Sequence, residues 1–255
     1  MLYMKASVKY CRITLLLVLL CLLIACQTRA QMLVKGGEGG VLLEYSGFTV
    51  SFNTQTKLPN WVAYELTAAE TEGTVKRNNN YYPDPELKEK QADNNDYRNS
   101  GWDRGHMAPA GDMKWSEQAM LESCYFTNMC PQNKNLNGGD WRSLEERCRA
   151  WAQKYGEIQI VCGPIIGEMK NGTLGENKVV IPDAFYKVLL VKIAEEYEGI
   201  GFVFENKAGH RKLGEYAMSI DSVEQITGLD FFHELPNRIE KKVEADYHKE
   251  VWAIQ

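Results

Sequence analysis

A short polar turn joins two side chains suited to acid–base chemistry on an anionic group. It reads Asp103-Arg104-Gly105-His106 and is followed by small residues up to Met113. An imidazole titrates near neutral pH and can take a proton from water. A guanidinium stays positively charged and binds phosphate oxygens. His106 is therefore a candidate general base, and Arg104 is a candidate for phosphate contact.

A second group of side chains downstream offers oxygen ligands. Asn137 lies in Leu136-Asn137-Gly138, and Glu145 follows it by eight residues. Mg²⁺ prefers oxygen ligands and keeps several waters, so one amide oxygen can anchor it, with Mn²⁺ as a substitute. Glu145 would act through a metal-bound water. The ordinary alternatives are a helix cap for Asn137 and an exposed helix acid for Glu145.

Two further residues complete the candidate site. Arg77 opens an Asn-, Pro- and Asp-rich loop over residues 77–100 that has no periodicity. A loop of this length in a compact domain is more often functional than idle. Arg77 is therefore a candidate for phosphate contact. Asn128 would orient either a phosphate or the loop that carries His106.

The elements that must position these residues indicate an α+β fold. Strand patterns occur at residues 41–52, 61–67, 124–128, 157–162, 178–181, 186–193 and 199–205. Helix patterns occur at residues 116–122, 140–155, 222–227 and 238–248. Because strands and helices do not alternate regularly, we expect a central, mostly antiparallel β-sheet flanked by helices. Residues 41–255 are predicted to form one domain.

With these motifs, the chain resembles the DNA/RNA non-specific endonucleases, the ββα-metal nucleases. The resemblance runs from about Tyr45 to Pro236. It is carried by Asp103-Arg104-Gly105-His106, Asn128 with Pro131-Gln132, Leu136-Asn137, Trp141, Leu144-Glu145, Gly163-Pro164, Ile181–Val188 and Thr227–Phe232.

The resemblance implies a role for each candidate. His106 would be the general base, Asn137 the sole protein ligand of Mg²⁺, and Glu145 the residue that holds metal-bound water. Arg104, Arg77 and Asn128 would support the phosphate. Gly138 departs from the family, in which Gln often follows the metal asparagine. The family also implies cleavage of single- and double-stranded DNA and RNA to 5′-phosphate products.

The N-terminus has the pattern of a signal peptide. Lys5, Lys9 and Arg12 precede an apolar run that ends at Cys26. This pattern predicts a signal over residues 1–25 and a flexible tether over residues 26–40. Leu23–Cys26 resembles a bacterial lipoprotein box, which would make Cys26 a lipid anchor, whereas ordinary cleavage would follow Ala30. We therefore expect a bacterial protein that is periplasmic, anchored in the outer membrane or secreted.

Four cysteines remain beyond this segment. They are Cys124, Cys130, Cys148 and Cys162. In an exported protein they permit up to two disulfides, and the alternative is that they are small buried hydrophobic residues. Because no C-x-x-C spacing is present, we expect no structural zinc site.

The formal net charge of −5 disfavours general attraction to a polyanion. A nuclease would then need a locally basic groove. Basic residues near the motifs are Lys76, Arg77, Arg98, Arg104, Lys114, Lys134, Arg142, Arg147 and Arg149. Two alternatives stay open: a catalytically silent surface lipoprotein that binds nucleic acid, and a nuclease restricted to DNA.

Overall fold

The computed structural model describes residues 33–37 and 39–254. The predicted signal over residues 1–25 and the predicted acylation site at Cys26 lie outside the described residues. Within the part of the chain that is described, no helix has the length and apolar character needed to cross a membrane.

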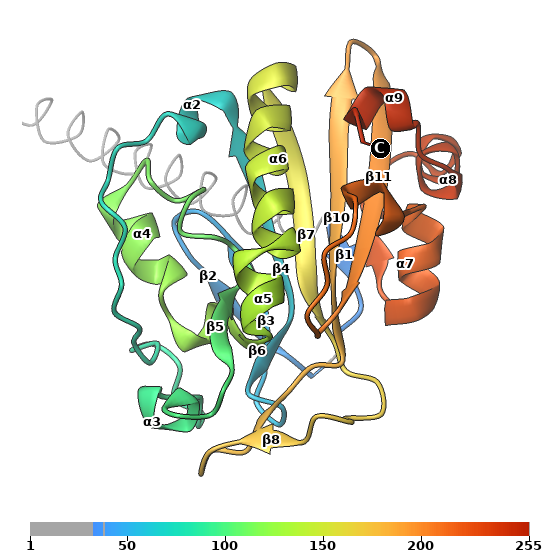
Figure 1. Ribbon diagram of the computed structural model, residues 1–255. Helices are drawn as coiled ribbons and strands as arrows, with labels where there is room; N and C mark the ends of the chain where they lie inside the picture. Colours follow the sequence, from blue (N-terminus) through green and yellow to red (C-terminus); the bar gives the residue numbers. More distant parts are fainter. Residues whose placement is uncertain (1–32, 38, 255) are drawn as a thin grey trace, which may run out of the picture.

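A seven-stranded sheet forms the centre of the molecule, and all its strand pairs are antiparallel (Figure 1). Its spatial order is β12-β11-β10-β7-β4-β3-β2. This confirms the expected α+β class. The strands are β2 (Val41–Glu44), β3 (Thr49–Asn53), β4 (Leu58–Thr67), β7 (Glu157–Ile165), β10 (Ala184–Ile193), β11 (Glu196–Glu205) and β12 (Ala217–Met218).

Both faces of this sheet are buried because side chains alternate along each strand. In β10, Phe185 and Leu189 join one core, whereas Tyr186 and Val188 join the other. Helix α6 covers the first face, and α7 and α8 cover the second (Figure 1). The helices are α2 (Ala68–Thr71), α3 (Asn94–Tyr97), α4 (Glu117–Ser123), α5 (Lys134–Gly138), α6 (Asp140–Tyr155), α7 (Ile220–Thr227), α8 (Asn237–Ala245) and α9 (Lys249–Trp252).

Three two-stranded ribbons lie outside the main sheet. One of them includes Val34 and Lys35, which lie within the predicted tether and form a strand. Val34 is buried and pairs with Phe231, so apolar contact fixes this stretch. The ribbons pair β1 (Val34–Lys35) with β13 (Asp230–Phe231), β5 (Asp103–His106) with β6 (Met129–Gln132), and β8 (Thr173–Leu174) with β9 (Val179–Val180).

Helix α6 is the longest helix among the described residues and has the bounds expected from its pattern. Trp141, Leu144, Cys148 and Trp151 form its buried stripe. The helix ends at Gly156, whose φ of +92° favours glycine. The predicted strand at 124–128 is wrong: Phe126–Asn128 form a 3₁₀ turn, closed by a hydrogen bond from the Asn128 N–H to the Tyr125 carbonyl, and the strand begins at Met129.

The four cysteines Cys124, Cys130, Cys148 and Cys162 are all free and buried. Burial raises the pKa of Cys148 to about 12 and that of Cys162 to about 11. These thiols therefore stay protonated at neutral pH and pack as small apolar groups. Of the two alternatives, the structure supports the hydrophobic one.

Candidate active site

The sequence motifs meet in a ββα arrangement. Strands β5 and β6 pair antiparallel from Asp103↔Gln132 to His106↔Met129, and α5 and α6 follow β6 in the chain. Alternation along β5 places Arg104 and His106 on one face of the ribbon. Gly105 is required on the other face, since a Cβ there would lie 2.2 Å from Oε1 of Gln132.

His106 is buried at the end of β5, and its Nε2 has no hydrogen-bond partner among the described residues. Burial, helped by the positive charge of Arg77, lowers the pKa of His106 to about 3. The imidazole is therefore neutral at physiological pH. A neutral ring with a free nitrogen can accept a proton, which is the property a general base needs.

This neutrality gives a prediction. In an NMR titration from pH 8 to pH 4.5, the ring signals of His106 should not shift, because its pKa is about 3. His248 is the internal control: its contact with Glu198 raises its pKa, so its signals should shift as the pH falls from 8. A His106 titration near pH 6.5 would contradict the prediction.

Arg104 lies between two aromatic rings. Its guanidinium carbon is 5.2 Å from the ring centroid of Tyr81 and 5.1 Å from that of Tyr97. Nη2 donates to the Asn94 carbonyl at 3.3 Å. The Tyr81 ring also lies 5.7 Å from the ring of His106. These contacts hold the arginine beside the imidazole.

Asn137 has the geometry of an oriented metal ligand. Its Nδ2 donates to Oδ2 of Asp103 at 3.0 Å, which turns Oδ1 away from that carboxylate. An oriented amide oxygen fits a hard divalent ion, and a carboxylate behind it is the usual support for such a ligand. Gly139 ends α5 and begins α6, so Asn137 and Glu145 do not lie on one continuous helix.

Glu145 is surrounded by charged groups. Burial raises its pKa to about 7, opposed first by Lys187 and also by Arg149 and Arg77, whereas Asp112 adds to the increase. Lys187 is fully buried on β10, with Nζ 4.7 Å from the ring centroid of Trp141. Arg77 lowers the pKa of both His106 and Glu145, so its positive charge lies within electrostatic range of both residues.

Asn128 holds a loop and does not face a phosphate. Its side chain is fully buried: Nδ2 donates to the carbonyls of Ala108 and Ser123, and Oδ1 accepts from the Ala108 N–H at 2.9 Å. Ala108 follows His106 by two residues. The geometry therefore favours the loop-orienting alternative over phosphate contact.

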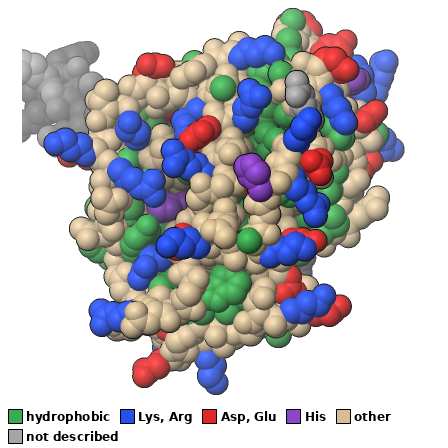
Figure 2. Space-filling model, in the orientation of Figure 1, with side chains coloured by type: hydrophobic (Ala, Val, Ile, Leu, Met, Phe, Trp, Pro, Cys, Tyr) green, Lys and Arg blue, Asp and Glu red, His purple; other side chains and the backbone are tan. Residues whose placement is uncertain are grey.

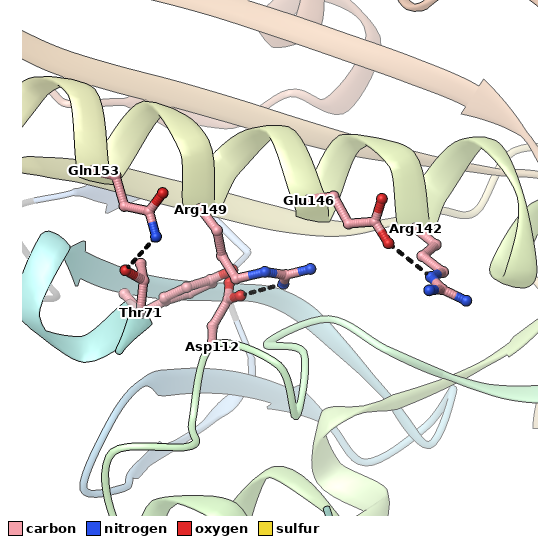
Figure 3. A network of polar contacts seen from close by, with 7 residues as sticks. Thr71, Asp112, Arg142, Glu146, Arg149 and Gln153 are labelled. Carbon is pink, nitrogen blue, oxygen red and sulfur yellow. Dashed lines mark hydrogen bonds and ion pairs between the residues drawn. The ribbon is translucent and has the colours of Figure 1, made fainter. Parts of the chain in front are cut away.

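Arg149 is the functional candidate that the sequence did not single out. It lies one helical turn after Glu145, a spacing that places two side chains on the same face. Figure 3 shows its guanidinium directed at Asp112, with Nη1 2.7 Å from Oδ1. Asp112 also accepts from the Tyr64 hydroxyl at 2.9 Å. This network holds the loop after His106 against α6.

Asp112→Ala should therefore lower the free energy of unfolding by about 3 kcal/mol. This value is at the lower end of the range for a broken buried ion pair, because Arg149 is partly exposed. Glu146→Ala is the matched control, since its pair with Arg142 is exposed and is worth less than about 1 kcal/mol (Figure 3). Urea denaturation of both variants checks this. Equal losses would refute the network's contribution.

The face that carries β5, α5 and α6 displays many Lys and Arg side chains (Figure 2). Acidic groups are interspersed among them, so the positive charge is local. A local basic surface of this kind can attract a polyanion to a chain whose net charge is −5.

Known nucleases are similar to this chain in sequence and structure. "Nuclease EXOG, mitochondrial" of Danio rerio is 34% identical over 204 residues, covering 74% of this chain and 60% of that protein. "Nuclease 1, mitochondrial" of Schizosaccharomyces pombe is 33% identical over 218 residues, covering 77% and 67%. A solved EndoG chain, from a complex with EndoGI, superposes with a TM-score of 0.72 at 26% identity, covering 78% and 88%.

These relatives correct one expectation from the sequence. The prediction of bacterial export is wrong, since four vertebrate relatives and two yeast relatives are named as mitochondrial nucleases. Basic residues without acidic ones occur in secretory signals and in mitochondrial presequences alike, so the charge pattern alone does not distinguish the two. The chain spans about three fifths of the length of the vertebrate relatives.

The family model for DNA/RNA non-specific endonucleases matches residues 27–238. This range contains β5, β6, α5 and α6 and every candidate site residue. This family consists of metal-dependent nucleases, which agrees with the chemistry expected from the sequence. The chain belongs to the DNA/RNA non-specific endonuclease family.

Proposed function

We propose that the chain is an Mg²⁺-dependent endonuclease that hydrolyses phosphodiester bonds in DNA and RNA and leaves 5′-phosphate ends, with its catalytic domain in residues 41–255. The observation that carries this proposal is the buried, neutral His106 with a free Nε2, on the same ββα unit as an oriented Asn137. A protein that only bound nucleic acid would have no use for such a base.

In this proposal, Nε2 of His106 accepts a proton from the attacking water. The ring is a weak base in the free protein because of burial and Arg77. A bound phosphate places negative charge beside the ring and offsets the charge of Arg77, which favours the protonated imidazole. The base therefore becomes stronger when substrate is present.

Asn137 would hold the divalent ion through Oδ1, with Asp103 fixing the amide. When bound, the ion would supply positive charge that stabilises the phosphate in the transition state. Glu145 orients water in this region, while Arg77, Arg104 and Arg149 neutralise charge on the phosphate. Asn128 acts as a positioning residue for the His106 loop.

The test is a side-by-side digest of plasmid, single-stranded DNA and RNA by the purified protein. We expect all three to be degraded with Mg²⁺ or Mn²⁺ and to survive in EDTA, and end-labelling should find 5′-phosphates. Cleavage of DNA alone would establish the DNA-restricted alternative. Binding of both nucleic acids without cleavage, by folded protein in Mg²⁺, would establish the silent alternative.

A further inference from the structure

Five acidic side chains gather on the sheet face opposite α6. They come from α7, β13 and α8, whose residues Ile220, Val223, Phe231 and Val243 belong to the second core. Figure 1 shows α7 and α8 away from β5 and α5. We call this group the acidic cluster: Asp221, Glu224, Asp230, Glu240 and Glu244.

The carboxylate oxygens are spaced like ligands around a cation. One atom each from Asp221, Glu224 and Glu244 lie within 4.8 Å of one another, and the same holds for Asp230, Glu240 and Glu244. Ca²⁺ binds oxygens at about 2.3–2.6 Å, so two ligands on opposite sides of one ion are about 5 Å apart. Each set of three therefore fits around a single Ca²⁺ ion, and Glu244 belongs to both.

A separate observation at Glu244 points to a ligand. The residue is only 7% exposed, and its Oε1 has no hydrogen-bond partner among the described residues. Buried carboxylate oxygens are costly when nothing compensates them. Among the described residues, the Phe231 N–H is the donor at the cluster, and it binds Glu224 at 2.7 Å.

The negative charges of the acidic cluster also favour a bound cation. Burial is the main cause that raises the pKa of Glu244 to about 8, and the neighbouring carboxylates of the acidic cluster raise it further. The charges acting on Glu224, from Asp230, Asp221 and Glu240, are negative as well. A cation from solution that bound these carboxylates would relieve their mutual repulsion.

We propose that the acidic cluster is a Ca²⁺ site centred on the carboxylate of Glu244. Ca²⁺ suits it because that ion takes six to eight oxygens from the protein, whereas Mg²⁺ keeps its waters and uses one or two carboxylates. The ion joins α7 to α8 and β13. Because β13 pairs with β1, it also secures the N-terminal strand to the domain. Its role is structural and separate from the proposed nuclease site.

The experiment uses the full chain with Asn137→Ala, which removes the proposed catalytic ligand. Calorimetric titration with CaCl₂ should detect binding in this background. At about 100 times Kd, Ca²⁺ should raise Tm by about 5–10 °C. MgCl₂ at the same concentration should raise it less. Absence of binding heat together with an unchanged Tm would overturn the proposal.

Glu244→Gln, added to that background, identifies the site. It should abolish the Ca²⁺-dependent rise in Tm. Glu176→Gln is the matched control: the residue is exposed in the turn between β8 and β9, and the rise should persist. Equal Ca²⁺ effects in the two variants would refute the assignment. If Glu244→Gln does not fold, Asp221→Asn and Glu240→Gln replace it.

The same variants keep this proposal separate from the nuclease. With Asn137 intact, Glu244→Gln should digest plasmid in Mg²⁺ at the wild-type rate at 25 °C. A Ca²⁺ site without nuclease activity, or nuclease activity without a Ca²⁺ site, would each refute one proposal and leave the other standing.

Discussion

His106→Ala is expected to lower kcat/KM for plasmid and RNA cleavage by about 10²–10⁴-fold, the range for loss of a positioned general base. The effect should lie mainly in kcat, because His106 makes no hydrogen bond through Nε2 in the free protein and its removal leaves the basic residues in place. Steady-state rates on a labelled duplex, measured at saturating Mg²⁺, check the prediction.

His248→Ala is the control for this variant. His248 is exposed and pairs with Glu198 at 2.8 Å, so its removal should cost less than about 1 kcal/mol and leave the rate unchanged. Thermal unfolding must show that His106→Ala is folded. Folded His106→Ala protein that kept a tenth or more of the wild-type rate would exclude His106 as the base.

Asn137→Ala should raise the Mg²⁺ concentration for half-maximal activity by more than about 100-fold. Loss of a residue that only supports a ligand typically costs about 10–100-fold in metal affinity, and a direct ligand should exceed that range. Activity against Mg²⁺ concentration, together with Mn²⁺ binding followed by electron paramagnetic resonance, measures the effect.

Two matched variants test whether the loss of metal affinity comes from the Asn137 side chain itself. Asp103→Ala removes the acceptor that orients Asn137 but not the ligand, so its loss of metal affinity should fall within about 10–100-fold. Asn135→Ala changes an exposed asparagine on the same helix and should have no effect. If Asn135→Ala and Asn137→Ala behaved alike, Asn137 would not be the metal ligand.

Helix periodicity and helix caps could be predicted because they depend on residues that are close together in the sequence. The buried stripe of α6 follows a 3.6-residue period, and Ser116 caps α4 by accepting from the Ala119 N–H. The alternation of β10 likewise follows from backbone geometry. Sequence alone therefore determined the α+β class, the helix α6 that carries Glu145, and the family, whereas the expected turn at Asp103–His106 is strand β5 in the structure.

Tertiary structure decided what depends on contacts between distant residues. The burial of Asn128 assigns it to a loop, and the contact of Arg149 with Asp112 adds a residue that its spacing alone did not distinguish. The buried Lys187 beside Trp141 likewise requires the packing of α6 on β10.

Tertiary structure also determined which ionisable groups carry a charge. His106 is neutral because burial and Arg77 lower its pKa to about 3, although an isolated imidazole titrates near 6.5. The acidic cluster around Glu244 combines residues from α7, β13 and α8, whose sequence shows only scattered acids. Sequence thus determined which groups this protein carries and, for Glu145, the helix that carries it. The fold decided which of them meet, how deeply they are buried and, because desolvation and neighbouring charges set proton affinity, which are ionised.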